Sequence, residues 1–576
     1  MPTKCWIDQA IDKRETEIMT NVPETQYAVQ LVGPDELVLN SSKKVIQPGR
    51  RQILCRVEAV GLCFSDLKLL KQFSSHVRKS EIVSGIGGEV VSEIPSYVPG
   101  DSPTVPGHEA VVKIAVVGPE VENFKPGERY LVQTDYRWLR TVGSNAAFGY
   151  NFEGALQEYV LMDERVITSP EGESMLIPVS DELSVSAVAL VEPWACVENA
   201  YASQERQSLK TDGQMLIAAD VELRGDVLRN FFNRYGRPNQ ITWIWRSAVP
   251  GGLDVAVEKA TDISQLKDAG YDDVIYFGSD ARKAEALFAK VAARGLFNIV
   301  LCDGKFGRDV VTMVGRVHYG GIRIVGTAGW DPAESMEYIP ETGEIRAGDK
   351  INIIGAGGPM GMMHLIRCIC QGVKNISVFA GDVDEARLDA LIKIAAPLAK
   401  KNDVIYKPYK PTKDEIMEPF DYTVLMVPES NLVAGAVRNA AKRGIINIFA
   451  GMPATVTGQI ALDAYIQKQL YFIGTSGSVL GDMKRVLAKV ESGRLDTNVS
   501  VAAVCGLEGA AEGIRAIENR RIAGKIIVYP ACKGLQLTLL EKLAGQIPQV
   551  AECLTEGLWN KRAENTLLKM YRNSQS

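Results

Sequence analysis

Short runs in which polar and apolar residues alternate dominate the first part of the chain and predict β-strands. Between about residues 26 and 200, these runs are punctuated by Gly and Pro, which end strands and form turns. Clear examples lie at 51–60, 110–117 and 156–162. This part of the chain is therefore predicted to be β-rich.

From Gln214 the pattern changes to short apolar runs separated by stretches with helical spacing, such as 281–293. Strands that alternate with helices in this way favour βαβ units on a parallel sheet. A segment at 330–346, with two prolines and several glutamates, is typical of a linker. The alternation restarts at 351–354, so we expect two parallel-sheet domains in tandem. The apolar runs of the first domain lie at 215–219, 241–245, 274–277 and 298–301.

The second of these domains repeats a stretch of the first. The sequence AKRGIINI at 441–448 follows AARGLFNI at 292–299 at a spacing of 149 residues, and the match extends without a gap back to Asp421 and Asp272. A second echo, IVGTAG against FIGTSG, has a spacing of 148 residues. The chain is therefore expected to carry a nucleotide-binding-type unit twice.

The second unit has a glycine-rich loop between a strand and a helix. The strand-like run 351–354 leads into GAGGPMG at 355–361 and a helical stretch at 362–370. Glycines permit a tight turn and the close approach of backbone to a pyrophosphate on the helix N-terminus. The next strand ends near Asp382, about 20 residues past the glycines, where an acid binds the adenosine ribose and disfavours a 2′-phosphate. This combination indicates a site for NAD, with NADP less favoured; a glycine turn without a ligand is the alternative.

The first unit has lost most of these features. At a constant offset Gly225 matches Gly361, but the other loop glycines and the ribose acid are replaced. The replacements are Ala219 for Gly355, Val221 for Gly357, Glu222 for Gly358 and Arg246 for Asp382. A carboxylate facing the phosphates works against dinucleotide binding, so we interpret the first unit as a scaffold. A second site of altered specificity that uses Arg246 is the alternative.

Length, charge and composition exclude some classes of protein but do not indicate a function. A length of 576 residues implies several domains, and the net charge of −6 gives no electrostatic footprint for nucleic acid or an anionic membrane. No apolar run approaches the roughly 18 residues of a membrane helix, and the N-terminus lacks the apolar core of a signal peptide. The ten cysteines contain no Cys-x-x-Cys pair, which favours free thiols in a reducing, cytoplasmic compartment.

Four motifs in the β-rich part carry metal-binding and catalytic residue types in a set order. They are GLCFSDL at 61–67, PGHEA at 106–110, KPGER at 125–129 and VEPWACV at 191–197. As a set they resemble the medium-chain zinc-dependent dehydrogenases, most closely the sorbitol (polyol) dehydrogenase branch. The resemblance covers about residues 30–200 and the second unit as far as GKII at 524–527. It implies a GroES-like catalytic domain joined to Rossmann-type doubly wound sheets, and thus an α/β protein.

The resemblance also implies a role for individual residues. Cys63, His108 and Glu109 would bind a catalytic zinc, and Glu192 would be a fourth ligand or would hold a water at the metal. Ser65 would start the proton relay, and Asp66 would orient the metal-binding histidine. The residues implied at the cofactor are Gly355, Gly357, Gly358, Pro359, Met360, Gly361, Asp382 and Arg387.

Three departures from the family stand out. The spacing of 45 residues from Cys63 to His108 is longer than is usual, and the segment contains His76 and the cations Lys71, Arg78 and Lys79 among others. No cysteine lies between 133 and 149, where many relatives bind a structural zinc. The helix after the Glu-Pro motif leads first into the degenerate unit, so we expect the intact unit to fold back over the zinc.

These observations predict four segments and an enzymatic function. We expect a catalytic domain at 1–205 completed by 500–535, a degenerate sheet domain at 206–332, an NAD-binding domain at 345–499, and a helical tail at 536–576 with helices at 535–544 and 556–571. The predicted function is zinc-dependent hydride transfer between NAD and a secondary alcohol of a polyol or sugar. The alternatives are a ketose-phosphate reductase, whose phosphate the cations at 71–105, Arg137 and Arg140 could hold, and a non-catalytic NAD(H)-binding scaffold. Family habit favours a dimer or tetramer.

Overall fold

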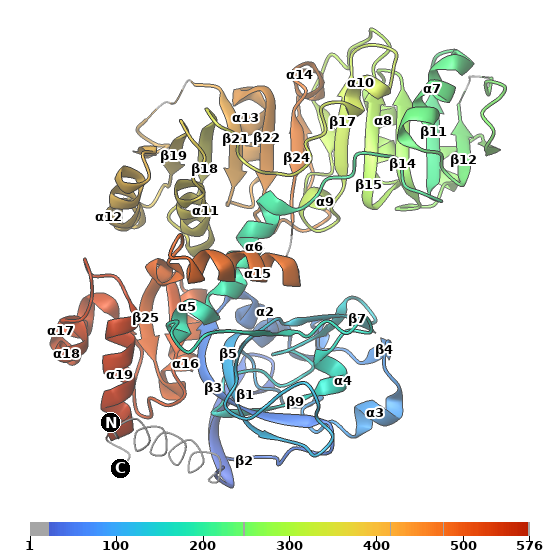
Figure 1. The fold of residues 1–576 in the computed structure, drawn as a ribbon. Coiled ribbons are helices and arrows are strands. Elements are labelled where there is room, and N and C mark those ends of the chain that lie inside the picture. The colour runs from blue at the N-terminus through green and yellow to red at the C-terminus, as the bar shows by residue number, and fades with distance from the viewer. Residues whose placement is uncertain (1–21, 246–247, 415, 417, 476, 574–576) are drawn as a thin grey trace, which may run out of the picture. The chain divides into compact units, whose positions relative to one another are not determined.

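The computed structural model describes residues 22–573, apart from 246–247, 415, 417 and 476 (Figure 1). The chain divides into two compact units, each described here by itself. The first unit comprises Met1–Ala195 with Ser478–Ser576, and the second comprises Cys196–Gly477. The predicted α/β class with parallel sheets is confirmed. The boundaries of the four predicted segments stay a prediction.

An eight-stranded sheet forms the centre of the first unit, in the order β10-β6-β5-β3-β26-β25-β27, with β9 also paired to β3. Because β26, from the C-terminal part of the chain, pairs antiparallel with β3, the two ends of the chain complete one sheet. The strands are β3 (Gln52–Leu62), β5 (Glu109–Val117), β6 (Arg129–Val132), β9 (Tyr159–Asp163), β10 (Leu176–Pro178), β25 (Val501–Cys505), β26 (Lys525–Val528) and β27 (Thr538–Leu539).

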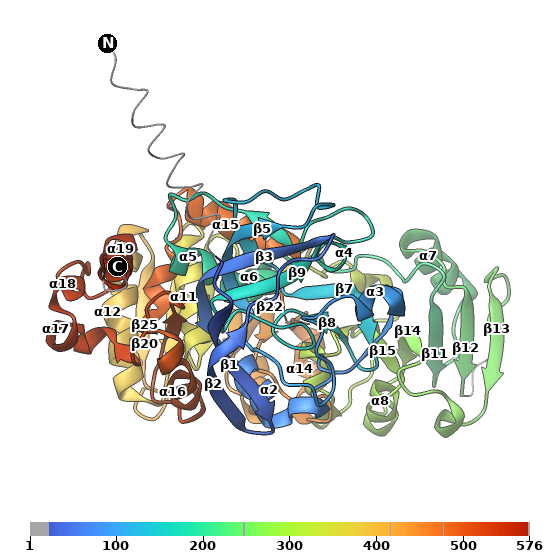
Figure 2. The ribbon, with the colours of Figure 1, turned by 90° about the horizontal axis from the view of Figure 1, so that it is seen from below.

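Smaller elements surround this sheet. β1 (Thr25–Gly33) pairs with β2 (Glu36–Lys44), and β7 (Asp135–Thr141) joins β4 (Ile82–Ser84) and β8 (Asn145–Ala147). The long segment between Cys63 and His108 supplies α2, β4 and α3, and α2 lies beside α16 (Figures 1 and 2). The main helices are α2 (Phe64–Gln72), α3 (Gly88–Ser92), α4 (Glu164–Ile167), α5 (Val185–Ala189), α6 (Val191–Ala202), α15 (Leu480–Glu491) and α16 (Leu507–Glu518).

The C-terminal tail packs on the first unit through a buried carboxylate. Glu564 accepts hydrogen bonds from the backbone N–H groups of Val185 and Ser186, each at 2.8 Å. This contact satisfies donors that the first turn of α5 leaves open. The tail holds α18 (Pro548–Ala551) and α19 (Lys561–Asn573). The helix predicted at 535–544 is wrong in its first half, because β27 adds to the sheet there, and the chain is helical only in the 3-10 turn Leu540–Lys542 and in α17 (Leu543–Gln546).

The first sheet of the second unit has six parallel strands in the order β13-β12-β11-β14-β15-β17, a doubly wound arrangement. The strands are β11 (Gln214–Ala219), β12 (Gln240–Ile244), β13 (Ala256–Ala260), β14 (Tyr271–Phe277), β15 (Val291–Val300) and β17 (Arg323–Thr327). The helices are α7 (Gly225–Tyr235), α8 (Ala281–Phe288), α9 (Gly315–His318) and α10 (Ala333–Met336).

The second sheet of this unit has the same strand order, β20-β19-β18-β21-β22-β24. Its strands are β18 (Lys350–Ile354), β19 (Ser377–Gly381), β20 (Ile405–Tyr409), β21 (Phe420–Leu425), β22 (Ala440–Ile448) and β24 (Tyr471–Ile473). Its helices are α11 (Pro359–Cys370), α12 (Glu385–Lys401), α13 (Ser430–Asn439) and α14 (Leu462–Gln467).

The repeated sequence forms the same bent strand in both sheets. Arg294 in β15 and Arg443 in β22 have positive φ angles of 59° and 61°, and the strand register shifts beside each of them. A bulge of this kind lets a strand begin before the bend, so β15 starts at Val291. The helix expected at 281–293 is therefore too long, because α8 ends at Phe288.

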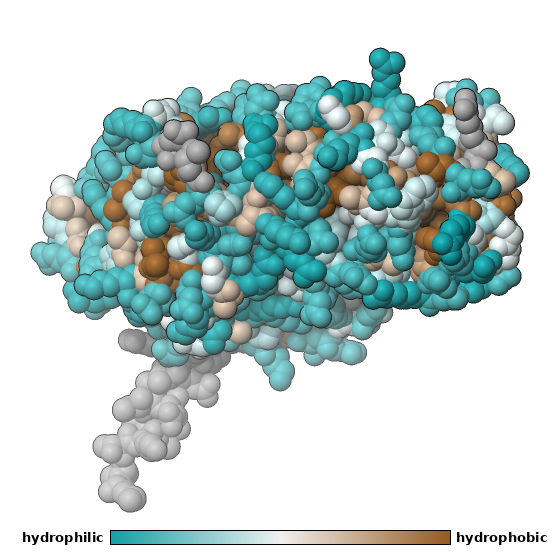
Figure 3. Space-filling model, turned by 90° about the horizontal axis from the view of Figure 1, so that it is seen from above, coloured by the Kyte–Doolittle hydropathy of each residue, from teal (hydrophilic) through white to brown (hydrophobic). Residues whose placement is uncertain are grey.

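The face shown in Figure 3 is mostly hydrophilic, with hydrophobic residues in scattered groups. Within the described residues, no helix combines the length and the apolar character needed to cross a membrane. The nine cysteines that lie in the described part of the chain are all free thiols.

Candidate functional site

The turn from β3 into α2 presents Cys63 and Asp66. Cys63 is the N-cap residue of α2, and its backbone N–H donates to the Asp66 carboxylate at 2.9 Å. The other Asp66 oxygen lies 3.2 Å from Nδ1 of His108 and accepts from the backbone N–H of Gly107. Asp66 is thus buried and holds the His108 ring by this contact, while its role behind a metal ligand stays a prediction.

His108 and Glu109 reach the same place from the start of β5. Glu109 pairs with Gly61 on the neighbouring strand β3, and a Cβ at Gly61 would collide with the Glu109 carboxylate. Glycine at this position therefore leaves room for the side chain of Glu109 to turn towards Cys63. Both His108 and Glu109 are buried.

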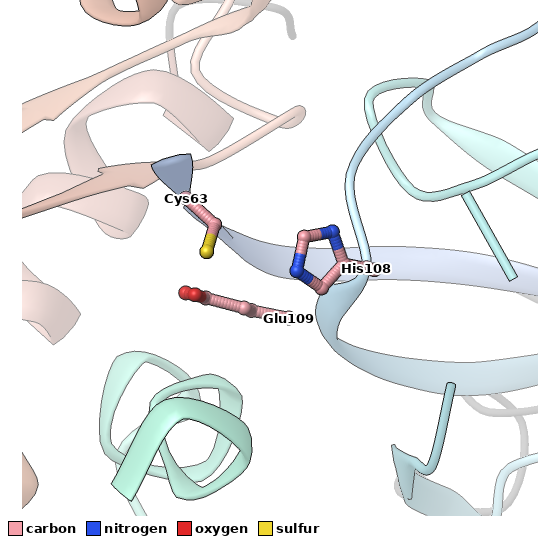
Figure 4. A group of neighbouring side chains, drawn as sticks. All are labelled: Cys63, His108 and Glu109. Carbon is pink, nitrogen blue, oxygen red and sulfur yellow. The ribbon is translucent and has the colours of Figure 1, made fainter. Parts of the chain in front are cut away.

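The ligand atoms of Cys63, His108 and Glu109 all lie within 4.8 Å of one another (Figure 4). Oε2 of Glu109 is buried and accepts no hydrogen bond, so this carboxylate has an open acceptor position. A thiolate, an imidazole and a carboxylate are the donors that Zn²⁺ prefers, and three protein ligands are typical of a catalytic site. The donor set therefore fits a catalytic zinc.

The charges around this group compete with one another. Burial alone would lower the pKa of His108, but Tyr150 and Asp66 raise that pKa well above its ordinary value. Burial raises the pKa of Glu192 to about 7, and Glu109 adds to that effect. A metal ion would replace the proton on His108, because metal ligands bind in their deprotonated forms.

Glu192 and Ser65 stand at the margin of the group. Glu192 is buried in α6, but the converging set found among the described residues comprises Cys63, His108 and Glu109 without it. Ser65 is half-buried in the first turn of α2, two residues after Cys63. The roles predicted for both residues, ligand or water holder and proton relay, stay predictions.

Lys525 also belongs to this site, although no role was predicted for it from the sequence. Its ammonium group is buried and donates to Oε1 of Glu109 at 2.6 Å and to the backbone carbonyl of Leu62 at 2.7 Å. Lys525 thus fixes the carboxylate whose other oxygen is open. The signal was present in the GKII motif at 524–527, but only the pairing of β26 with β3 shows where the lysine points.

Lys525→Met is expected to weaken zinc binding by about 10- to 100-fold, the usual cost of losing an outer partner of a metal ligand. The reason is that Glu109 would lose the partner that orients it. Competition with a chromophoric chelator measures the affinity, and Lys533→Met, which removes an exposed ion pair with Glu158, is the control. Unchanged or tighter binding in a folded Lys525→Met protein would show that the lysine does not position the ligand.

The long segment after Cys63 brings His76 and Arg78 close to the metal group. The ring of Tyr150 lies 5.7 Å from that of His108 and 5.0 Å from that of His76, centroid to centroid. The Arg78 guanidinium lies 5.5 Å from the Tyr150 ring, and its Nη1 is 2.7 Å from Oδ1 of Asp135. Burial and the nearby Arg78 lower the pKa of His76 to about 4. Nothing in the sequence pointed to Tyr150.

Most of the other cations that the sequence suggests for a phosphate have partners within the protein. Lys79 is buried and donates to the backbone carbonyls of Val98 and Ser102, and Lys71 pairs with Asp35 and Glu518. Arg137 donates to the backbone carbonyl of Ser478 at 2.6 Å, and Arg140 is exposed. Lys71 and Lys79 therefore have structural roles, which corrects the expectation that they hold a phosphate.

The glycine loop of the second sheet joins β18 to α11 as predicted. Gly355 has a φ of +85°, and α11 has Gly358 as its N-cap and Pro359 at its start, with no side chain capping its first turn. A Cβ at Gly361 would overlap the carbonyl oxygen of Gly355 and lie 2.8 Å from Cα of Ala356. The first-turn N–H groups thus have no side-chain acceptor, which fits a phosphate.

Asp382 lies directly beside this loop. Its two carboxylate oxygens accept from the backbone N–H groups of Gly357 at 2.8 Å and Asp384 at 2.9 Å. The side chain of Arg387 also borders the loop, since a Cβ at Gly357 would lie 2.8 Å from the Arg387 Cβ. Met360 follows Pro359 in α11. The residues predicted to bind the cofactor are thus assembled in one place, and their role stays a prediction.

The corresponding edge of the first sheet carries a cluster of side chains that contact one another. Lys283 pairs with Asp220 and lies 4.5 Å from the Trp245 ring, while the Tyr276 hydroxyl donates to Asp220 at 2.8 Å. The scaffold interpretation of this unit fits that arrangement.

Trp245, not Arg246, occupies the place of Asp382. In the first sheet Gln214 pairs with Gln240, and in the second sheet the equivalent residue Lys350 pairs with Ser377. Residues of the second strand are therefore equivalent at a spacing one residue larger than the spacing that relates Gln214 to Lys350. The predicted match of Arg246 with Asp382 is therefore wrong, and Arg246 itself lies outside the described residues.

Comparison with known proteins identifies part of the chain. Residues 49–171 match the alcohol dehydrogenase GroES-like domain. The chain is 26% identical over 254 residues to mannitol-1-phosphate 5-dehydrogenase of Aliivibrio fischeri, a match that covers 40% of this chain and 59% of that protein. It is 24% identical over 227 residues to L-sorbose 1-phosphate reductase of Klebsiella pneumoniae, which covers 38% and 54%. The chain thus spans little more than half the length of these curated relatives.

Among solved structures, the fold is similar to 2R,3R-butanediol dehydrogenase from Bacillus subtilis, with a TM-score of 0.49 and 14% identity over 88% of this chain and 100% of that one.

Proposed function

We propose that the chain is a medium-chain zinc-dependent dehydrogenase that transfers a hydride between NAD and a secondary alcohol or ketone of a polyol or sugar, because residues 49–171 match the alcohol dehydrogenase GroES-like domain. One observation carries the proposal. Cys63, which is half-buried, converges with the buried His108 and Glu109, and Glu109 keeps an open acceptor atom. Packing alone does not require that arrangement, since an unpartnered buried oxygen is costly.

The residues of the group have separate tasks in this proposal. When bound there, zinc supplies a Lewis acid that lowers the pKa of an alcohol, and NAD supplies the hydride acceptor. Asp66 holds the proton on Nδ1 of His108, which leaves Nε2 as the ligand atom. Lys525 fixes Glu109, and the Ser65 hydroxyl is the first group to receive the alcohol proton.

The cofactor is assigned to the second sheet. The open first turn of α11 suits a pyrophosphate, and Asp382 suits a ribose with free hydroxyls, which favours NAD over NADP. That this sheet serves the metal group is part of the proposal, because hydride transfer needs the nicotinamide in contact with the reacting carbon.

A screen of polyols and ketoses, free and phosphorylated, with NAD and NADP tests the proposal. Zinc-loaded protein is expected to change NADH absorbance with at least one secondary alcohol or ketone, and to prefer NAD. Absence of turnover with every substrate, in protein that binds NADH and zinc, would favour the non-catalytic scaffold instead.

Arg78 favours a phosphorylated substrate as a second candidate. Its guanidinium lies against Tyr150, which packs beside the metal-binding His108, and its side chain is partly exposed. A guanidinium binds phosphate with two parallel hydrogen bonds. The two phosphosugar enzymes among the relatives agree with this candidate.

Arg78→Ala separates the two candidates. If the substrate is phosphorylated, its KM is expected to rise about tenfold or more, corresponding to about 1.4 kcal/mol or more, with little change for the unphosphorylated analogue. Arg224, which forms an exposed ion pair with Asp226 and is not one of the cations considered for the phosphate, is replaced in the same way as the control. Equal effects on both substrates would remove Arg78 from the phosphate subsite.

A further inference from the structure

The two six-stranded sheets of the second unit meet at their sixth strands. β17 is the last strand of the first sheet and β24 the last of the second, and the two lie side by side (Figure 1). An uncovered edge strand offers unpaired N–H and C=O groups to another chain. How these two edges are covered therefore bears on how the chain associates.

A short pair of strands shows that the two sheets are related by a local two-fold axis. β16 (Val310–Thr312) pairs antiparallel with β23 (Gly458–Ile460), and Val311 lies opposite Gln459. These two residues are equivalent in the repeat, since they are 148 residues apart, the spacing that relates IVGTAG to FIGTSG. Antiparallel pairing centred on equivalent residues places a two-fold axis between them.

The helices beside the edge strands make the same contact in both directions. Ile466 of α14 packs closely against Gly326 of β17, because a Cβ added at Gly326 would lie 2.8 Å from the Ile466 side chain. Gly474, the equivalent residue just after β24, has the backbone of His318 in α9 equally close, with the Cα at 2.9 Å. In each sheet, a glycine at the edge thus leaves room for a helix of the other sheet to pack closely. Reciprocal contacts of this kind define an isologous interface, the type formed by two copies of one chain.

Polar and apolar groups at the interface between the two sheets also have partners. The hydroxyl of Tyr465 donates to the carbonyl of Ile324 on β17 at 2.8 Å and accepts from the N–H of Phe472 on β24 at 3.0 Å. Apolar residues of both sheets, including Ile324 and Phe472, form one continuous buried cluster. Both edges are therefore closed by polar and apolar contacts that lie within a single chain.

We propose that the first sheet is an internal partner, which covers the edge of the cofactor-type sheet where a second copy of this chain would otherwise bind. A surface kept for this purpose needs β16, β17 and α9, but not a working glycine loop. That explains why the edge follows the repeat closely while Trp245 and the Lys283–Asp220 pair occupy the cofactor edge of the same sheet. The proposal stands on the second unit alone and does not depend on the substrate.

The test is a disulfide between Val311→Cys and Gln459→Cys in the full-length protein. Residues opposite each other in antiparallel strands have Cβ atoms about 4.5–5.5 Å apart, within reach of a disulfide after small adjustment. Both side chains are accessible, since Val311 is half-buried and Gln459 exposed. The two single variants are the controls, and peptide mapping without reductant separates the new bond from native thiols.

The expected result is a bond between residues 311 and 459 inside one chain, with the mass staying at 62.9 kDa under denaturing, non-reducing conditions. The yield should not depend on protein concentration, because both cysteines belong to the same molecule. A covalent dimer linked through 311 and 459 would overturn the proposal, because the edges would then pair between chains. Failure to link in a folded double variant would overturn it too, because the strands would then not be paired.

Discussion

Replacing Cys63 by Ser is expected to abolish stoichiometric zinc and to lower turnover by about 10³-fold or more. The thiolate is one of the three ligands that converge among the described residues, and the loss of a Lewis acid that contributes several kcal/mol costs about tenfold for each 1.36 kcal/mol. His108→Ala is expected to act in the same way. Metal analysis of the purified protein and initial rates with the best substrate of the screen measure both effects.

Cys553→Ser is the matched control for this change. Cys553 is a thiol of the C-terminal tail, 3.4 Å from the Thr566 hydroxyl, and takes no part in the metal group. Its replacement should leave zinc content and rate unchanged. Full zinc content and full activity in the Cys63→Ser protein would contradict the assignment of the metal centre.

Gly361→Ala is expected to weaken NADH binding by about 100-fold, which corresponds to about 2.7 kcal/mol. The added Cβ would overlap the carbonyl oxygen of Gly355 and crowd Ala356, so the loop that receives the pyrophosphate must shift. Fluorescence titration with NADH measures the affinity. It requires neither metal nor substrate, so the result concerns the second sheet alone.

The repeat provides a matched control, Gly225→Ala in the first sheet. A Cβ at Gly225 would meet side-chain atoms of Arg229 and Pro250 at 3.2 and 3.3 Å, where small movements suffice. We expect this variant to bind NADH like the unmodified protein. Equal losses in the two variants, or a loss in Gly225→Ala alone, would contradict the assignment of the cofactor to the second sheet.

Local motifs explain how much of the site could be predicted from the sequence. A glycine loop between a strand and a helix, and an acid after the next strand, are contiguous, so β18, α11 and Asp382 appear where they were expected. Cys63, His108 and Glu109 are recognisable because their motifs follow one another in a set order, and the structure brings the three together. The GroES-like domain is confirmed by the match over residues 49–171.

The remaining features depend on contacts between distant segments. Lys525 enters the metal group because β26 pairs with β3, more than 400 residues earlier in the chain, a pairing that no local pattern encodes. The match of Arg246 with Asp382 failed because a constant offset ignores a one-residue difference between the sheets. The sequence could not distinguish the cations either, since only the fold shows that Lys79 is buried and donates to backbone carbonyls, while Arg78 lies beside Tyr150 and Asp135.

The most direct test of the account is the rate of NADH formation from the best alcohol substrate, measured as chelated protein is titrated with zinc. The account predicts no turnover after chelation, and recovery that saturates at one zinc per chain, while Cys63→Ser protein stays inactive throughout. Turnover that survives chelation, or zinc-independent turnover in the Cys63→Ser protein, would contradict the claim that Cys63, His108 and Glu109 form a catalytic metal centre.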